Sequence, residues 1–184
     1  MLVFLDDDKN NWGKSINGIK VFGPLSQSTS FKNAFFINGI GSPANFLQKE
    51  KILTKTALSL DRFITLIHPS AFISKTSIIG SGTVIFQNVV ISSNTTIGNH
   101  VVILPNSIIS HDNKLGDYTC VAGGVCISGS VQVGKSCYLG AGSLVKEGVS
   151  IADKSIVGIG SVVLKDVKKN SVYVGNPAKF LRPS

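Results

Sequence analysis

The sequence predicts a mainly β protein in which a parallel β-helix of six-residue repeats follows a small α/β domain. Two observations predict the β-helix. From Ile67 to Val163 an Ile, Leu or Val recurs at every sixth residue without a break. The residue four positions after each of these is small or β-branched, and Asn113 is the one exception. An α-helix repeats after about 3.6 residues and a strand after about 2, so a period of six indicates stacked short strands joined by turns.

The six-residue period also predicts how the repeats pack. Each repeat supplies a short strand and a turn, with its large aliphatic residue inward and its small residue in the corner. Three repeats make one triangular coil, and stacked coils satisfy each other's backbone hydrogen bonds. Gly, Asn and Asp occupy the turns, where positive φ angles are common. A β-sandwich, the other all-β candidate, would space its turns by about 8 to 12 residues with a drifting phase.

The residues before Ile67 are typical of a small α/β domain. We expect buried strands at residues 2–5, 20–22, 34–37 and 63–67, and a helix at residues 44–56 introduced by Ser42-Pro43. This order predicts an α/β domain over residues 1–66, the β-helix over 67–170 and a tail over 171–184. No glycine-rich turn precedes the first strand. We therefore interpret the front domain as shortened, lacking the first strand and the glycine-rich turn of a complete nucleotide-binding half.

Composition excludes several classes of function. With 18 Lys and Arg against 10 Asp and Glu, the formal net charge is +8 at pH 7. No aromatic-rich basic strand or recognition helix accompanies this charge, so we expect a phosphate-bearing small molecule rather than nucleic acid as partner. No apolar run approaches the ~18 residues of a membrane span, and no secretory signal is evident. The three cysteines, an odd number, indicate reduced packing residues of a cytoplasmic protein.

Four segments carry a resemblance to a known family: Phe4-Leu5-Asp6-Asp7-Asp8, His68-Pro69-Ser70-Ala71, Ile109-Ser110-His111-Asp112 and Val174-Gly175-Asn176-Pro177-Ala178-Lys179. Together with the hexapeptide array, they make the chain resemble the left-handed β-helix acyltransferases. Within this class it resembles the bacterial nucleotide-amino-sugar N-acetyltransferases and sialic-acid O-acetyltransferases. The resemblance implies acetyl-CoA as co-substrate and a homotrimer that holds it between adjacent prisms. It also implies that the front domain binds the nucleotide of a nucleotide-linked amino sugar used in surface glycan synthesis.

Acetyl transfer needs a base that takes a proton from the attacking amine or hydroxyl, and histidine suits this role. Of the three histidines, His68 beside Pro69 is interpreted as structural, and His100 in the turn Gly98-Asn99-His100 as a surface residue. His111 is the candidate base. In the resembling family the acidic residue that follows, here Asp112, orients the histidine and stabilises the imidazolium.

The resemblance assigns further contacts by motif position. It places acetyl-CoA at Cys120, Gly129, Ala141 and Ile159, with the Gly129 N–H facing the developing oxyanion. Cys120 stands where the family has a second histidine, so a covalent acetyl-cysteine is an alternative to direct transfer. We expect no metal site, because His100 and His111 are eleven residues apart and fall at different places in the repeat.

The two aspartates Asp6 and Asp7 follow the first expected strand, at the edge where α/β sheets bind ligands. We expect them to bind substrate, and a solvated loop is the other interpretation. The acceptor itself stays open. N-acetylation of a nucleotide-linked 4-amino sugar is the primary hypothesis, and O-acetylation of a sialic-acid-like sugar is the alternative. A purely structural β-helix is the non-enzyme candidate, and the His111–Asp112 pair argues against it.

Overall fold

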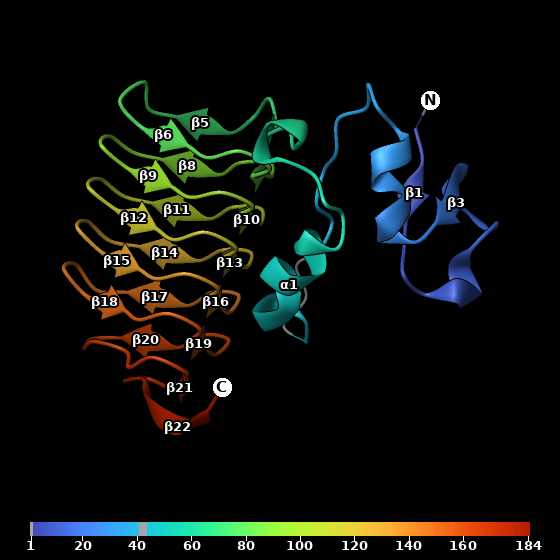
Figure 1. Ribbon diagram of the computed structural model, residues 1–184. Coiled ribbons are helices and arrows are strands. Elements are labelled where there is room, and N and C mark those ends of the chain that lie inside the picture. Colours follow the sequence, from blue (N-terminus) through green and yellow to red (C-terminus); the bar gives the residue numbers. More distant parts are fainter. Residues whose placement is uncertain (1, 41–43) are drawn as a thin grey trace.

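A computed structural model describes residues 2–40 and 44–184 and shows a prism of stacked coils with the N-terminal part beside it (Figure 1). The prism is a parallel β-helix whose strands succeed one another around three sheets. The β4 sheet comprises β4 (Leu66–Ile67), β7 (Val84–Ile85), β10 (Val102–Ile103), β13 (Cys120–Val121), β16 (Tyr138–Leu139) and β19 (Ile156–Val157), extended by β21 (Ser171–Val174) and β22 (Lys179–Pro183).

The other two sides of the prism have the same construction. The β5 sheet comprises β5 (Phe72–Ile73), β8 (Val90–Ile91), β11 (Ile108–Ile109), β14 (Cys126–Ile127), β17 (Leu144–Val145) and β20 (Val162–Val163). The β6 sheet comprises β6 (Ile78–Ile79), β9 (Thr96–Ile97), β12 (Lys114–Leu115), β15 (Gln132–Val133) and β18 (Ser150–Ile151). These stacked short strands confirm the β-helix that the six-residue period predicts.

The register of the strands explains the six-residue pattern. Parallel partners lie one coil, or 18 residues, apart, as in the pair Ile103 and Val121 and the pair Val121 and Leu139. The second residue of each strand points inward, and these three side chains are fully buried. Columns of aliphatic residues therefore fill the interior of the prism, and each coil buries the apolar surface of the next.

The polar members of the corner row also have a defined place. Thr119 donates its hydroxyl to the carbonyl oxygen of Gly134 at 3.0 Å and accepts the N–H of Cys137 at 3.1 Å. Asn113, the exception in the sequence pattern, makes the same two connections, to Ser128 and Val131. The side chain at residue 113 is therefore part of the interior ladder, and the amide replaces the hydroxyl of a Thr or Ser.

The N-terminal part differs from its predicted elements. Its sheet, in the order β1-β3-β2, comprises β1 (Phe4–Leu5), β3 (Ile19–Gly23) and β2 (Ser15–Ile16). The predicted strand at residues 34–37 is wrong, since Phe36 makes only an isolated bridge to Phe63. The reason is that the Arg62 guanidinium donates hydrogen bonds to the carbonyl oxygens of Phe31 and Ala34. These carbonyl groups are therefore not available to pair with a neighbouring strand.

The helix predicted at residues 44–56 and the strand predicted at residues 63–67 are both shorter in the structure. The helix α1 spans Lys49–Thr54 after a 3₁₀ turn at Phe46–Gln48. Ser42-Pro43, predicted to introduce the helix, lie outside the described residues. Of residues 63–67 only β4 is a strand, and it belongs to the first coil of the prism. The division into parts at residues 1–66, 67–170 and 171–184 stays a prediction.

The three outer faces of the prism differ in chemistry. The segment around α1 covers the β4 sheet (Figure 1), where the ring of Phe46 packs 5.7 Å from that of Tyr138. The outward side chains of the β6 sheet from β9 to β18 are polar: Thr96, Lys114, Gln132 and Ser150. The outward side chains of the β5 sheet are apolar, and Phe72, Ile108 and Leu144 are exposed. Among the described helices, none is long and apolar enough to cross a membrane.

Candidate active site

The side chains of His111 and Asp112 form a hydrogen-bonded pair in the turn between β11 and β12. The Nδ1 atom of His111 lies 2.7 Å from Oδ2 of Asp112, and both side chains are about half exposed. Asp112 has a φ angle of 58°, and its N–H donates to the carbonyl of Ser93 in the preceding coil. The bond to His111, together with one from Asn94, lowers the pKa of the Asp112 carboxyl. A proton held on Nδ1 leaves the Nε2 lone pair of His111 free to act as a base.

Gly129 lies one coil below the imidazole of His111. A Cβ atom at this position would stand 2.6 Å from Cε1 and 2.8 Å from Nε2 of His111. Real contacts of this kind are about 3.5 Å or longer, so any side chain here would displace the ring. The absence of a side chain at residue 129 therefore lets the imidazole lie against the prism beside Asp112.

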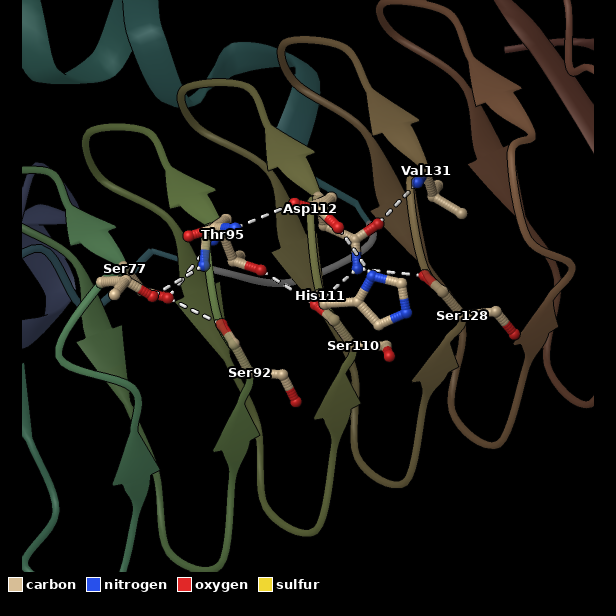
Figure 2. A network of polar contacts seen from close by, with 11 residues as sticks. Ser77, Ser92, Thr95, Ser110, His111, Asp112, Ser128 and Val131 are labelled. Atoms are coloured by element: carbon tan, nitrogen blue, oxygen red, sulfur yellow. Dashed lines mark hydrogen bonds and ion pairs between the residues drawn. The ribbon is translucent and has the colours of Figure 1, made fainter.

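Asn113 fixes the turn that carries this pair. Its Nδ2 atom donates to the carbonyl oxygens of Ser110 at 2.8 Å and Ser128 at 3.0 Å. Its Oδ1 atom accepts the N–H of Val131 at 2.7 Å, and the residue is fully buried. Figure 2 shows the interior hydrogen bonds beside the His111 ring, with Ser110 on the same coil as the ring and Ser128 on the next coil. The buried amide thus ties the backbone on both sides of His111 to the next coil.

Ala141 and Ile159, which are also expected to contact acetyl-CoA, lie at a different corner of the prism from His111. Ala141 and Ile159 occupy the turns that enter the β5 sheet, whereas His111 occupies a turn that leaves it. They stack on each other, because the N–H of Gly160 donates to the Ala141 carbonyl at 2.9 Å, and Ile159 is 83% exposed. One chain therefore does not bring these residues to His111. It places them along the opposite edge of the exposed apolar β5 face.

Cys120 lies on the β4 sheet, covered by the N-terminal part, and is 1% exposed. Burial raises the pKa of its thiol to about 11, although the charge of Lys49 acts in the opposite direction. A thiol with this pKa is a poor nucleophile at neutral pH, which disfavours the covalent alternative. The structure does not place Cys120 at the corner with His111, so its contact with acetyl-CoA stays a prediction.

Lys49 is a buried residue that the sequence analysis passed over. Its Nζ atom donates to the carbonyl oxygen of His100 at 2.6 Å, and burial lowers its pKa to about 8. His100 stacks on Tyr118 with ring centroids 5.5 Å apart, and burial lowers its pKa to about 4. The Lys49–His100 bond attaches α1 to the prism. The prediction of a surface histidine at residue 100 is wrong, because the N-terminal part covers this turn and His100 is only 4% exposed. No sequence signal marked Lys49, because its partner lies 51 residues away and outside the repeat pattern.

The carboxylates of Asp6 and Asp7 have partners within the N-terminal part. Asp6 accepts the backbone N–H of Asp8 and the side chain of Asn11. Asp7 accepts the N–H of Leu25 and pairs with Lys55 at 2.7 Å, and these contacts lower its pKa. Both residues therefore shape their loop, and a role in substrate binding stays a prediction.

His68, the third histidine, lies away from the other two, and the described residues contain no cluster of metal ligands. His68 is exposed at the entry to the first coil, where its Nδ1 atom lies 2.9 Å from the hydroxyl of Ser70. Across residues 2–40 and 44–184, no three His, Cys, Asp or Glu side chains gather as a set of metal ligands. The three cysteines form no disulfide.

Similar structures match nearly the whole chain. The acetyltransferase domain of PglB from Neisseria gonorrhoeae FA1090 has 26% identity and a TM-score of 0.84, covering 97% of this chain and 86% of that one. PerB from Caulobacter crescentus, crystallised with CoA and GDP-perosamine, has 26% identity and a TM-score of 0.85, covering 96% of this chain and 84% of PerB. WeeI from Acinetobacter baumannii AYE has 27% identity and a TM-score of 0.85, covering 97% of this chain and 85% of WeeI.

One curated relative matches a shorter stretch. The UDP-N-acetylbacillosamine N-acetyltransferase of Bacillus subtilis (strain 168) is 43% identical over 53 residues. This stretch is 29% of the present chain and only 23% of that protein.

The prism of hexapeptide coils is the architecture of the left-handed β-helix acyltransferases, and the chain is an enzyme of this class. A second comparison gives the family. A profile of the GMPPB C-terminal domain family matches residues 65–176, and the chain belongs to this family. The match covers the whole repeat region from β4 to β20.

Proposed function

We propose that the protein is an acetyl-CoA-dependent N-acetyltransferase that acts on the amino group of a nucleotide-linked 4-amino sugar for surface glycan synthesis. The His111–Asp112 pair at the edge of the exposed β5 face carries this proposal. The comparisons support it: PerB was crystallised with CoA and GDP-perosamine, PglB with acetyl-CoA, and the bacterial relative is named for an amino-sugar acetylation.

The proposed reaction is a direct transfer. The Nε2 atom of His111 takes a proton from the acceptor amine as its nitrogen attacks the thioester carbonyl carbon. The carbon–sulfur bond then breaks, and the coenzyme A sulfur leaves with the proton returned by the imidazolium. Asp112 stabilises the imidazolium, because its carboxylate lies 2.7 Å from Nδ1. We assign the backbone N–H of Gly129 to the developing oxyanion, as the sequence analysis proposed.

The active enzyme in this proposal is a homotrimer. Of the outer faces, the β4 face is covered by the N-terminal part, the β6 face is polar from β9 to β18, and the β5 face is apolar and exposed. Burial of such a face against another copy is favourable. His111 lies along one edge of this face, and Ala141 and Ile159 lie along the other. Cyclic assembly through the β5 face would bring the two edges of neighbouring chains together around acetyl-CoA.

The N-terminal part is proposed to hold the nucleotide. The structural neighbours cover 96–97% of the chain, so their similarity extends over this part as well as the prism. The net charge of +8 favours a phosphate-bearing substrate. A cytoplasmic location belongs to the same proposal, on the ground that the cysteines form no disulfide.

The test is turnover with defined acceptors. Purified protein is incubated with acetyl-CoA and a panel of nucleotide-linked 4-amino sugars beside free sialic acid, and release of coenzyme A is followed. The proposal predicts release and an N-acetylated product with at least one amino sugar. Release with the hydroxyl acceptor alone would replace N-acetylation with O-acetylation. No release with any acceptor, from a folded trimeric sample that binds acetyl-CoA, would contradict the proposed acceptor class.

A further inference from the structure

The second oxygen of Asp112 is held by a residue one coil earlier. The Nδ2 atom of Asn94 donates to Oδ1 of Asp112 at 3.2 Å, while Oδ2 faces the His111 ring. Asn94 is itself anchored, because its backbone N–H donates to the hydroxyl of Thr76 at 3.0 Å. The three side chains therefore form one chain of contacts, from amide to carboxylate to imidazole.

An equivalent pair at another corner shows which part of this arrangement belongs to the fold. Asn88 donates to Oδ1 of Asn106 at 3.2 Å, and its backbone N–H donates to the hydroxyl of Ser70 at 3.0 Å. The φ angles of Asn88 and Asn94 are 57° and 56°. The two asparagines thus share conformation, anchor and bond length. They differ in the acceptor, which at residue 112 is a carboxylate that also holds an imidazole.

We propose that Asn94 is a positioning residue for the transfer reaction: by holding Oδ1 of Asp112, it directs Oδ2 to Nδ1 of His111. This inference rests on the proposed role of His111 as base. A carboxylate on an exposed turn can rotate about its Cβ–Cγ bond. Each rotation away from the ring breaks the hydrogen bond between the Nδ1–H of His111 and the carboxylate. The amide of Asn94 opposes this rotation because it can donate to Oδ1 only when Oδ2 faces the ring.

The consequence is control of the imidazole tautomer. While Asp112 accepts from Nδ1, the neutral ring carries its proton there and presents the Nε2 lone pair to the acceptor. When the carboxylate turns away, the ring can carry its proton on Nε2, and it is then unable to act as a base from that atom. Asn94 acts through Asp112 and touches no reacting atom.

The isosteric substitution Asn94→Asp tests this role, with Asn88→Asp as the matched control. Both replace a donor with an acceptor in the same backbone conformation, which Asp tolerates. At residue 88 the partner amide of Asn106 can rotate and donate instead. At residue 94 the partner carboxylate has no proton to donate, so the contact is lost. A second pair, Asn94→Ala and Asn88→Ala, removes the contact without adding charge.

Two readouts separate positioning from stability. Nitrogen-15 NMR of the imidazole, assigned by loss of the signal in His111→Ala and recorded at a pH where the ring is neutral, reports the tautomer of the resting protein. We expect the Nδ1–H form in the wild type and in both residue 88 variants, and a mixture in both residue 94 variants. We also expect kcat to fall about fivefold in Asn94→Ala, the rate equivalent of one hydrogen bond, with KM for acetyl-CoA unchanged.

The same tautomer in all variants, or equal kcat in Asn94→Ala and Asn88→Ala, would overturn the assignment. The NMR experiment needs no acceptor, so it decides the role of Asn94 even if the panel of sugars shows no turnover. Failure of the proposed function and failure of this inference are thus distinguishable.

Discussion

Substitution of Gly129 by alanine tests how the candidate base is seated. The added methyl group would stand 2.6 Å from Cε1 of His111. A normal carbon–carbon contact is about 3.5 Å, so the imidazole must move by about 1 Å. The Nδ1–Oδ2 bond to Asp112 is 2.7 Å long. A movement of about 1 Å away from the prism would stretch it beyond the range of a hydrogen bond.

The expected result of Gly129→Ala is a large loss of rate without a loss of stability. A positioned general base contributes about 10²- to 10⁴-fold to a rate, so loss of its orientation should lower kcat about tenfold to a hundredfold. Stability should change little, because the half-exposed His111 ring can swing into solvent. The assay is coenzyme A release, with the melting temperature measured beside it. Gly123→Ala is the control for stability, since its methyl would meet only the Pro105 carbonyl oxygen at 3.4 Å.

A double-mutant cycle shows whether the methyl group acts through the imidazole. If it does, Gly129→Ala should have no further effect on the residual rate of His111→Ala. Additive effects of the two substitutions would refute the reasoning, and so would a Gly129→Ala enzyme with wild-type kcat. The backbone N–H is kept in the variant, so its proposed oxyanion contact does not confuse the result.

Three other predictions follow from the packing. Asn113→Ala should lower the free energy of unfolding by about 2–4 kcal/mol in denaturant titrations, because the buried N–H of Val131 loses its acceptor. Asn113→Thr should lower it by less than about 1 kcal/mol, because a threonine hydroxyl can make the interior hydrogen bonds seen at the other corners. Equal losses in the two variants would contradict this role of the residue 113 side chain. Lys49 has a pKa lowered from 10.5 to about 8, so the unfolded chain binds more protons between these values and the native state gains stability as pH rises through them. Relative to Lys49→Met, the wild type should gain about 3 kcal/mol from pH 7 to 10.5, and a constant difference would show that the lysine is not buried. We expect the wild type to sediment as the proposed trimer and Leu144→Asp, on the exposed β5 face, to sediment as the 19.4 kDa monomer. A trimeric variant would exclude this face from the interface.

The sequence predicts the prism well because its period maps directly onto space. Three repeats of six residues make one coil, so residues 18 apart share a column. This arithmetic places Gly129 below His111 and would also have placed Asn94 above Asp112. The same arithmetic puts Ala141, 30 residues after His111, at another corner. The contact between His111 and Asp112 is equally predictable from the sequence, because the two residues are adjacent in the chain.

The N-terminal part is less predictable because its contacts follow no period. The Lys49 ammonium meets the His100 carbonyl across 51 residues, and no local pattern indicates it. The apolar run at residues 34–37 satisfies a strand pattern, but the Arg62 guanidinium occupies the neighbouring carbonyl groups. Asp6 and Asp7 resemble a ligand-binding edge in sequence, yet Asp6 accepts hydrogen bonds within its own loop and Asp7 pairs with Lys55, 48 residues away. For Lys49, Arg62 and Asp7, a long-range side-chain contact decides the structure.

The most direct test of the proposed chemistry is the turnover of His111→Asn beside the wild type, with acetyl-CoA and a nucleotide-linked 4-amino sugar. Asparagine can keep a polar group at the exposed turn but cannot accept and return the proton. We expect an N-acetylated sugar from the wild type and a kcat lower by about a hundredfold or more in the variant, with the same melting temperature and the same binding of acetyl-CoA. A variant with near-normal turnover would contradict the assignment of His111 as the base.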